Sequence, residues 1–380
     1  MKAMDYNETL NAMTLARLSY YSLASIHLLY RQAGSATAVI DNIDNIRDIL
    51  PDASERLVEI LRDCRRMRSR AEEELDYDLS HGVKPLDMSS SEYPHRLLEC
   101  DDAPLVIYYK GNANLNASRV INIVGTRRCT PYGQDLIRSF VADMATLCPG
   151  VLVVSGLAYG IDVCAHSQAL ERGLSTIGVL AHGLDDLYPT PHRAIASKMV
   201  EQGGLLTEFM TRTKSDKINF VRRNRIVAGM SDACILVESA AHGGGLITAE
   251  IARGYNRDVF AFPGRVGDEF SEGCNNLIRD NGAALLTDAE HFVKAMGWEG
   301  DASLAKARSE GIERTIFPNL SPEEATVVET LAQRGDLHLN MLATQTGIAV
   351  NRLTSVLFEL EMKGLLRNMA GGMYHLMPMR

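Results

Sequence analysis

Three features that would assign the chain to a specialised class of protein are missing from its sequence. No apolar run reaches the length of a membrane-spanning helix, and residues 1–11 lack the basic-then-apolar layout of a signal peptide. The seven cysteines are odd in number, scattered and never spaced as CxxC, which argues against a disulfide framework or a zinc site. We therefore expect a cytoplasmic protein without a membrane partner, a metal or a cofactor, whose cysteines are buried and reduced.

An excess of positive charge is also missing. The chain has 39 Lys and Arg against 48 Asp and Glu, so its formal net charge of -9 would repel nucleic acid on average. Binding of a polyanion depends, however, on where cations cluster rather than on their total. A length of 380 residues with 46% apolar and 23% charged residues is typical of a globular protein with one large domain and smaller appendages.

The middle of the chain alternates short apolar runs with helical patterns. Seven Val/Ile/Leu-rich runs occupy residues 120–124, 151–154, 176–180, 205–207, 233–237, 259–262 and 284–286. Continuous apolar runs separated by amphipathic helices are typical of a parallel sheet covered on both faces. The sequence therefore predicts an α/β fold, with an extended Rossmann-like core over residues 81–299.

A helical N-terminal domain is expected over residues 1–80. Apolar positions at mixed spacings of three and four predict short helices with a turn at Gly34, and Ser54 to Leu75 is predicted as one charged amphipathic helix. The arginines of that helix lie beside acidic residues. We therefore favour a solvated helix face over a phosphate-binding one.

The C-terminal residues predict a second appendage. A charged, low-aromatic linker over residues 300–318 leads to Ser321, an expected N-cap followed by proline and two glutamates. Three helical patterns follow, the third ended by Gly364, and then a hairpin around Gly371-Gly372. Three helices and a hairpin predict a winged helix over residues 319–380.

Candidate binding residues follow the apolar runs, because ligands of an open parallel sheet bind beyond the carboxyl ends of its strands. After the first run, Gly125 permits close backbone approach, Thr126 can donate a hydrogen bond and Arg127 can form a forked contact with a phosphate. Gly244 and Gly245 predict a second anion cradle at a helix N-terminus. The alternative is a plain strand-to-helix turn with solvated arginines. GxGxxG and Walker patterns are missing, so ordinary dinucleotide or ATP binding is not expected.

The loop after the second run leads through Gly156 to Asp162 and into a helix that contains His166. Four residues apart, Asp162 and His166 share a helix face and could form an acid-base pair or bind a metal. No third ligand or nucleophile is evident nearby. We therefore favour an aspartate that complements the helix N-terminus and a histidine in the core.

The most cationic stretch of the core spans residues 212–225. Its single acid is Asp216, so six cations give a local charge of six minus one, or +5; they are Arg212, Lys214, Lys217, Arg222, Arg223 and Arg225. Phe220 offers a flat face for a base, and stacking contributes about 1 to 3 kcal/mol per base in single-strand binders. Some arginines could instead pair with Glu208 or Glu238, but we do not expect all six cations to be neutralised in this way. The stretch predicts a polyanion site.

Taken in order, these motifs resemble the DprA (Smf) family of DNA-processing proteins. The similarity runs over residues 80–297, through Val124–Arg127, Ser155–Asp162, Phe220–Ile226, Gly245–Ala249 and Ser271–Asn275. The resemblance implies a sterile-alpha-motif-like N-terminal domain, a Rossmann core and a winged helix. It implies a homodimer that binds single-stranded DNA, protects incoming DNA and loads the RecA recombinase in competence, natural transformation and homologous recombination, without being an enzyme.

The resemblance also assigns site residues. The family's phosphate motif falls on Gly125, Thr126 and Arg127, and its signature falls on Phe220, Arg223, Asn224 and Arg225. With the neighbouring loops, the expected nucleic-acid-binding set is Gly125, Thr126, Arg127, Gly156, Lys217, Phe220, Arg223, Asn224, Arg225, Gly244 and Gly245. Val221 and His192 replace the usual proline and asparagine, but neither change removes a cation.

Two alternatives belong to other classes. In the first, the chain is a nucleotide phosphoribohydrolase of the lysine-decarboxylase-like Rossmann group, with Glu250 as the acid, although His242 and Ile247 depart from that group's loop. In the second, the winged helix reads duplex DNA. Its presumed recognition helix carries few cations and two glutamates, which favours a protein-contact or regulatory module.

Overall fold

The structure, a computed structural model, describes residues 5–299, 320–363, 365–369 and 372–376. The chain divides into two compact units, Met1–Met296 and Gly297–Arg380. The finer predicted division at residues 80, 299 and 318 stays a prediction. The predicted linker over residues 300–318 and the predicted turn residues Gly364 and Gly371 lie outside the described residues.

Among the described residues, nine strands form one sheet in the first unit. Its order is β1-β2-β6-β5-β4-β3-β7-β8-β9. All seven predicted runs form strands, and these pair in parallel: β3 (Val120–Val124), β4 (Leu152–Ser155), β5 (Thr176–Val179), β6 (Gly204–Thr207), β7 (Ala233–Leu236), β8 (Asp258–Ala261) and β9 (Ala284–Leu285). Strands β3 to β7 are buried throughout, which explains their uninterrupted apolar sequences.

Two strands that the sequence analysis did not predict extend one edge of the sheet. They are β1 (Lys84–Asp87) and β2 (Val106–Gly111), and β2 pairs antiparallel with both β1 and β6. Short helices lie in three of the connections between strands: α7 (His95–Leu98), η2 (Thr190–His192) and α13 (Glu272–Arg279).

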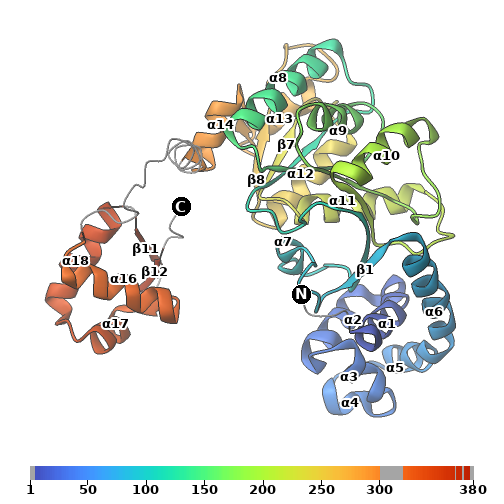
Figure 1. The fold of residues 1–380 in the computed structure, drawn as a ribbon, viewed down its shortest axis with the longest axis horizontal. Coiled ribbons are helices and arrows are strands. Elements are labelled where there is room, and N and C mark those ends of the chain that lie inside the picture. The colour runs from blue at the N-terminus through green and yellow to red at the C-terminus, as the bar shows by residue number, and fades with distance from the viewer. Residues whose placement is uncertain (1–4, 300–319, 364, 370–371, 377–380) are drawn as a thin grey trace. The chain divides into compact units, whose positions relative to one another are not determined.

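Helices cover both faces of the sheet (Figure 1). On one face α8 (Pro131–Leu147), α9 (Ile161–Glu171) and α10 (Arg193–Gln202) pack side by side, and α14 (Ala289–Ala295) packs on α8. On the other face α11 (Lys217–Gly229) packs against α12 (Gly244–Gly254). The chain passes from β3 through β4 and β5 to β6 in one direction and from β7 to β9 in the other, so right-handed crossovers place the two helix sets on opposite faces.

The reversal of direction lies between β3 and β7. These strands are paired, with Val124 opposite Leu236, so they end at the same level of the sheet. The loop that follows β3 and the loop that follows β7 then diverge to opposite faces. A topological switch point of this kind leaves a crevice in which open α/β sheets bind ligands.

The N-terminal helices pack next to the β1 edge (Figure 1) and share one hydrophobic core with the sheet. They are α1 (Tyr6–Ala16), α2 (Ser19–Ala33), α3 (Ala36–Asp41), η1 (Ile43–Asn45), α4 (Ile46–Ile49), α5 (Glu55–Arg62) and α6 (Cys64–His81). The predicted turn at Gly34 is confirmed, because this residue ends α2 in the left-handed conformation at φ 82°. The single helix predicted from Ser54 to Leu75 is wrong: the chain turns at Asp63, so α5 and α6 each bury their own apolar side chains.

Three arginines of α6, Arg66, Arg68 and Arg70, are paired with acids. Arg68 lies 3.1 Å from Glu72, as the solvated-face interpretation predicts. Arg70 has a further role, since it pairs with Glu74 at 2.6 Å and donates to the Thr211 carbonyl at 2.8 Å. Glu74 in turn accepts a 2.6 Å hydrogen bond from the Thr211 N–H. This cluster fastens α6 to the core.

The second unit has the predicted winged-helix architecture. It contains α16 (Pro322–Arg334), β10 (Leu337–His338), α17 (Leu339–Thr346), α18 (Val350–Met362), β11 (Leu366–Met369) and β12 (Met373–Leu376), with the strands in the order β10-β12-β11. Ser321 caps α16 as predicted and forms a reciprocal capping box with Glu324. The apolar faces of the three helices form a separate core. In the part of the chain that the structure describes, no helix is long and apolar enough to cross a membrane.

Candidate nucleic-acid interface

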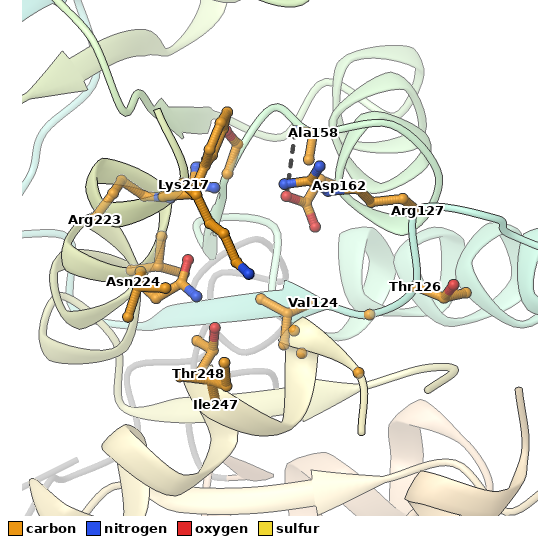
Figure 2. Close-up of a pocket in the computed structure, with 18 of the residues that line it drawn as sticks. Val124, Thr126, Arg127, Ala158, Asp162, Lys217, Arg223, Asn224, Ile247 and Thr248 are labelled. Atoms are coloured by element: carbon orange, nitrogen blue, oxygen red, sulfur yellow. Dashed lines mark hydrogen bonds between the residues drawn. The ribbon is translucent and has the colours of Figure 1, made fainter. Parts of the chain in front are cut away.

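A cavity of about 630 Å³ opens at the switch point of the sheet (Figure 2). Its walls are the loops that follow β3 and β4, the first turns of α11 and the N-terminus of α12. Ten of the eleven predicted site residues line it: Gly125, Thr126, Arg127, Gly156, Lys217, Phe220, Arg223, Asn224, Gly244 and Gly245. The structure thus brings together four segments that are spread between residues 125 and 245 of the sequence, and it leaves Arg225 outside.

The loop after β3 is held in place through its backbone. The Thr126 N–H donates to the Glu238 carbonyl at 2.8 Å, and the Thr126 carbonyl accepts from the Ile161 N–H at 3.1 Å. The Thr126 hydroxyl oxygen accepts from the Arg128 N–H at 3.1 Å. The adjoining Arg127 side chain is exposed and enters the cavity from this loop (Figure 2). Hydrogen bonds thus fix the backbone of the loop, and this backbone presents an exposed cation to the cavity.

Glu238 is a site-positioning residue that the sequence analysis did not assign. Its buried carboxylate accepts a 2.9 Å hydrogen bond from the Thr130 N–H and another from the Thr130 hydroxyl. These bonds connect the loop after β3 with the loop after β7 on the two sides of the switch point. The sequence does show an acidic residue directly after an apolar run, which could have marked Glu238. Only the fold shows that the partner of Glu238 is Thr130 and not an arginine.

Close packing between loops explains two of the glycines. A Cβ atom on Gly245 would lie 3.0 Å from the Gly125 Cα and 2.7 Å from the Leu236 side chain. A Cβ atom on Gly125 would lie 2.6 Å from the Ile161 side chain. Gly244 differs, because a Cβ there would meet nothing within 4 Å. Gly125 and Gly245 thus allow the two loops to touch, whereas Gly244 borders open space.

The N-terminus of α12 contributes backbone donors to the cavity. Its N-cap is Gly243, and no side chain of the described residues caps it. The first N–H groups of a helix have no partners within the helix, and the helix dipole makes this end favourable for an anion. The Thr248 side chain points into the same space (Figure 2). This end of α12 therefore suits a phosphate oxygen.

Helix α11 supplies a cation and an aromatic ring. Asp216 caps it by accepting a 2.7 Å hydrogen bond from the Asn219 N–H. Lys217 is exposed and extends toward the centre of the cavity, near Asn224 (Figure 2). The partly exposed Phe220 ring has the Arg127 guanidinium 5.0 Å from its centroid, within the range of a cation–π contact.

Arg223 lines the cavity but is a buried wall residue. Its side chain, 4% exposed, donates to the carbonyls of Gly156 and Val179, which lie beyond β4 and at the end of β5. A Cβ atom on Gly156 would overlap the guanidinium, so that glycine makes room for Arg223. Burial lowers the pKa of Arg223 to about 10, with Asp162 acting in the opposite direction, so the group remains a cation at neutral pH.

Arg225 does not line the cavity, so its assignment to the DNA contacts stays a prediction without support from the geometry. Arg225 is 6% exposed, pairs with Glu208 at 2.5 Å and donates to the Asp102 carbonyl. It lies two residues from Arg223, about 200° around the helix, so the two side chains leave α11 in nearly opposite directions. Arg222 lies 3.7 Å from the same Glu208. Arg212 lies 3.2 Å from Glu73.

The formal charge of +5 counted for residues 212–225 is larger than the charge available to a ligand. Three of the six cations have carboxylate partners, and Arg223 is committed to backbone carbonyls. In the described chain the basic side chains that line the cavity are Arg127, Lys217 and Arg223. The site is less cationic than the sequence suggested, and its cations come from two segments rather than one.

The structural interpretation of Asp162 and His166 is confirmed. His166 is fully buried, with its Nδ1 2.7 Å from the Thr176 hydroxyl, and burial lowers its pKa to about 3. Asp162 accepts a 3.3 Å hydrogen bond from the Ala158 N–H near the start of α9, and burial raises its pKa. Among the described residues, no group of three or more His, Cys, Asp and Glu could hold a metal ion.

Two cysteines depart from expectation. Five of the seven are buried as predicted, but Cys129 and Cys164 are partly exposed. Both lie close to the loop after β3. Their position follows from the packing of that loop on α9, which the sequence alone does not show.

The residues invoked by the alternative functions lie apart from the cavity or are paired. Glu250 is exposed, does not line the cavity and lies 3.0 Å from Arg253. In the winged helix, Arg352 lies 2.7 Å from Glu323, and Lys363 lies 2.5 Å from Glu324. The described residues therefore form neither a hydrolase site around Glu250 nor a set of unpaired cations on the presumed recognition helix.

The fold and the site together define a class: a Rossmann-type α/β protein whose switch-point crevice carries cations, helix N–H groups and an aromatic ring, with a winged helix in the same chain. The chain belongs to the DNA recombination-mediator protein A (DprA) family. The model of that family matches residues 84–297, and the model of the DprA winged helix domain matches residues 314–372. The resemblance seen in the sequence motifs is thereby confirmed.

Individual relatives agree with this assignment. Protein Smf of Escherichia coli strain K12 is 34% identical over 304 residues, which cover 77% of each chain. The putative DNA processing protein DprA of Mycobacterium tuberculosis strain H37Rv is 33% identical over 315 residues, covering 80% of this chain and 79% of its own. DNA processing protein A of Streptococcus pneumoniae has a solved structure with a TM-score of 0.56 and 30% identity, covering 72% of this chain and 97% of that one.

A second solved structure is of DNA processing protein A from Helicobacter pylori, described for its single-stranded DNA binding mode. It has a TM-score of 0.51 and 27% identity, and it covers 56% of this chain and 95% of that one.

Proposed function

We propose that this chain binds single-stranded DNA in the switch-point cavity. We further propose that it acts in the cytoplasm as a homodimer that protects incoming DNA and loads the RecA recombinase during natural transformation and recombination, and that it is not an enzyme. Membership of the DprA family and the DNA-binding neighbour from Helicobacter pylori support this proposal. The observation that carries it is the Arg127 guanidinium over the Phe220 ring, beside Lys217 and the N-terminus of α12.

The chemistry of the cavity favours a nucleic acid with accessible bases. A volume of about 630 Å³ is of the size of a small-molecule pocket, which a nucleotide unit can occupy. Phe220 offers a ring face for a base, and the Tyr188 ring lies 6.0 Å away. Bases in a duplex are stacked on each other and cannot reach such a ring, whereas those of a single strand can. A single strand therefore fits this cavity better than a duplex.

The charges of the cavity favour a phosphate backbone. Arg127 and Lys217 are exposed cations from the loop after β3 and from α11, and the uncapped end of α12 lines the same cavity. The acids among the lining residues are Asp162, which is buried, and Asp216, which caps α11. Binding to phosphates by such cations releases counterions, so affinity should fall steeply with salt.

Fluorescence anisotropy with a labelled oligothymidine tests the proposal against a matched pair of lysines. Lys217 lines the cavity, whereas Lys214, three residues earlier and also exposed, does not. We expect Lys217→Ala to reduce the slope of log Kd against log salt by about 0.7, the value for one phosphate contact with a single strand. Lys214→Ala should leave the slope unchanged. Absence of binding by the wild type at low salt, or equal effects of the two variants, would contradict the proposal.

The recombinase and dimer parts of the proposal have their own tests. Light scattering during gel filtration measures the mass in solution, and a mass of one chain at micromolar concentration would refute the homodimer. RecA filament assembly on single-stranded DNA coated with a single-strand-binding protein should speed up when this protein is added. An unchanged rate, with DNA binding intact, would remove the loading role alone.

A further inference from the structure

The candidate DNA site has two tyrosines at its rim. Tyr159 lies in the loop after β4, and Tyr188 lies between β5 and η2. They are 44% and 46% exposed, respectively. Single exposed aromatic residues are common on protein surfaces, whereas aromatic residues that gather at one place mark an interaction site. These two gather beside the cavity that is lined by Phe220.

Both tyrosines line a second, smaller cavity that adjoins the first. The two cavities share five lining residues: Arg127, Gly156, Ala158, Tyr188 and Phe220. Tyr159 follows Ala158, which lies at the edge of the first cavity beside Asp162 (Figure 2). The second cavity has a volume of about 10 Å³, which suffices for about one water molecule. A base cannot enter it and would instead lie over the rings at its rim.

The Tyr188 ring extends the surface that begins at Phe220. The centroids of the two rings are 6.0 Å apart and their planes are tilted by 59°, within the range of contact between aromatic side chains. The Arg127 guanidinium lies 5.0 Å from the centroid of the same Phe220 ring. Arg127, Phe220 and Tyr188 therefore form one connected surface that passes from the first cavity to the second.

Buried His182 holds the backbone of Tyr188. The His182 Nδ1 lies 2.8 Å from the Gly183 carbonyl, so this nitrogen carries the proton and donates it. The Nε2 of the same ring then accepts a 3.1 Å hydrogen bond from the Tyr188 N–H. A ring on a fixed backbone has less freedom to lose when a ligand binds.

The Tyr159 ring is supported by His192, the residue that replaces the family's usual asparagine. The two rings meet edge to face, with centroids 4.9 Å apart and planes at 69°. His192 is itself buried, and its Nδ1 donates to the Leu157 carbonyl at 3.0 Å. An asparagine at this position would offer Tyr159 no ring. The departure of this chain from the family pattern therefore supports an exposed aromatic side chain at the rim.

The chemistry of this rim suits bases rather than phosphates. Among the described residues that line the second cavity, Arg127 is the one with a charge, and the others are apolar, small or aromatic. Ring faces accept any base, because every base has a face for stacking. A nucleotide over the two tyrosines would thus be held through its base, whatever its sequence.

We propose that Tyr188 and Tyr159 form a second base-stacking platform, which receives the nucleotides of a single strand that follow the one at Phe220. This inference rests on the proposed function and deepens it, since it extends the path of the DNA beyond the first cavity. Because the platform adds no cation, it should raise affinity without changing the dependence on salt.

Fluorescence anisotropy with two oligomers separates stacking from all other roles of the tyrosines. One is an oligothymidine of about 20 nucleotides, beyond the site size usual for one single-strand-binding domain. The other has the same length and phosphates but abasic sugars. Tyr188→Leu should raise Kd for oligothymidine about fivefold, the lower end of the contribution of one stacked base, and leave Kd for the abasic oligomer and the salt slope unchanged. Tyr159→Leu should act in the same way, by about threefold.

Three further variants serve as controls. Tyr188→Phe keeps the ring and should bind oligothymidine within about twofold of wild type. Tyr6→Leu, at a tyrosine that is 50% exposed on α1 and lines neither cavity, should bind as wild type does. His192→Asn removes the support of Tyr159 and should weaken binding no more than Tyr159→Leu does. Circular dichroism should show the same thermal unfolding for wild type and all variants of Tyr188 and Tyr159.

The outcomes distinguish this inference from the proposed function. If wild type binds oligothymidine and both leucine variants bind it equally well, the platform is refuted and the proposed function stands. If the leucine variants lose affinity for the abasic oligomer to the same extent, the tyrosines act on the shape of the site and the platform is again refuted. Failure of wild type to bind oligothymidine at low salt would refute the proposed function and this inference with it.

Discussion

The loop after β3 and helix α11 both carry arginines that match the family's sequence motifs, yet they use them differently. The loop exposes Arg127 to the cavity, where it lies over the Phe220 ring. Helix α11 buries Arg223 against carbonyl groups and Arg225 against Glu208. A motif arginine can therefore bind the ligand or build the wall that the ligand contacts, and burial and partners decide which.

The difference has a physical cause. A guanidinium with five donors can satisfy several carbonyls or a carboxylate at once, which makes arginine suitable for joining separate chain segments. Arg223 joins the segments after β4 and β5, and Arg225 joins α11 to Glu208 and the Asp102 carbonyl. In a protein of net charge -9, such internal contacts leave fewer arginines available to bind an anionic ligand. The comparison predicts that substitutions in the two regions will have separable effects.

The largest effect is expected from removal of Arg225. Arg225→Ala leaves Glu208 buried without its closest cation, and loss of one partner of a buried ion pair costs about 3 kcal/mol or more. We expect the free energy of unfolding in urea to fall by that amount, while the folded variant binds oligothymidine with a Kd within about twofold of wild type.

Arg222→Ala on the same helix is the control for Arg225. Its guanidinium lies 3.7 Å from Glu208 and is more exposed, so its loss should cost less than about 1 kcal/mol. A folded Arg225→Ala variant that bound DNA about tenfold more weakly would show that Arg225 does contact DNA and would remove the contrast between the two regions.

The opposite behaviour is expected for Arg127. Arg127→Ala removes an exposed cation, so the free energy of unfolding should change by less than about 0.5 kcal/mol. Loss of a charged hydrogen bond to phosphate should raise Kd about tenfold to thirtyfold, or about 1.5 to 2 kcal/mol. Arg128→Ala, next to it in the loop and also exposed but outside the cavity lining, should bind normally. If both substitutions weakened DNA binding equally, Arg127 would contribute only through long-range electrostatic attraction and not through a specific contact.

A smaller effect is expected where the two regions meet, at Phe220. Phe220→Leu keeps an apolar side chain of similar size but removes the ring beneath Arg127. Loss of one stacked base costs roughly 1 kcal/mol at the lower end of the known range, so Kd should rise about fivefold with an unchanged salt slope. A variant with intact affinity would assign Phe220 to packing against Arg127 and Tyr188 alone.

Much of the fold could be predicted from the sequence, because strands buried on both faces must be continuously apolar. All seven parallel strands were predicted on that basis. Strands β1 and β2 were not, since they pair antiparallel at an edge and include a proline, Pro85, and a lysine, Lys110. The break at Asp63 was also missed, because α5 and α6 both have helical periodicity and only their packing separates them.

The location of the candidate site could be predicted from the sequence, but the directions in which its arginine side chains point could not. Loops after parallel strands converge at one edge, which is why ten of the eleven residues line one cavity. The direction of each α11 arginine depends on partners far along the chain: Arg223 bonds to Gly156, 67 residues away, and Arg225 to Asp102, 123 residues away. Spacing along a helix fixes the angle between two side chains, but it does not show which of them faces the ligand.

The smallest effect is expected from removal of the winged helix, and it tests whether DNA binding belongs to the Rossmann core alone. The cations of its presumed recognition helix are paired within the winged helix itself: Arg352 with Glu323 and Lys363 with Glu324. Deletion of residues 315–380 therefore removes no cation of that helix that the described structure leaves without a carboxylate partner, and Kd for oligothymidine should change by less than about twofold with the same salt slope. Lys217→Ala in the truncated chain should lower the slope as it does in the full chain. A weaker, less salt-dependent interaction after the deletion alone would mean that the winged helix contacts DNA, and that its paired cations exchange their carboxylate partners for phosphates.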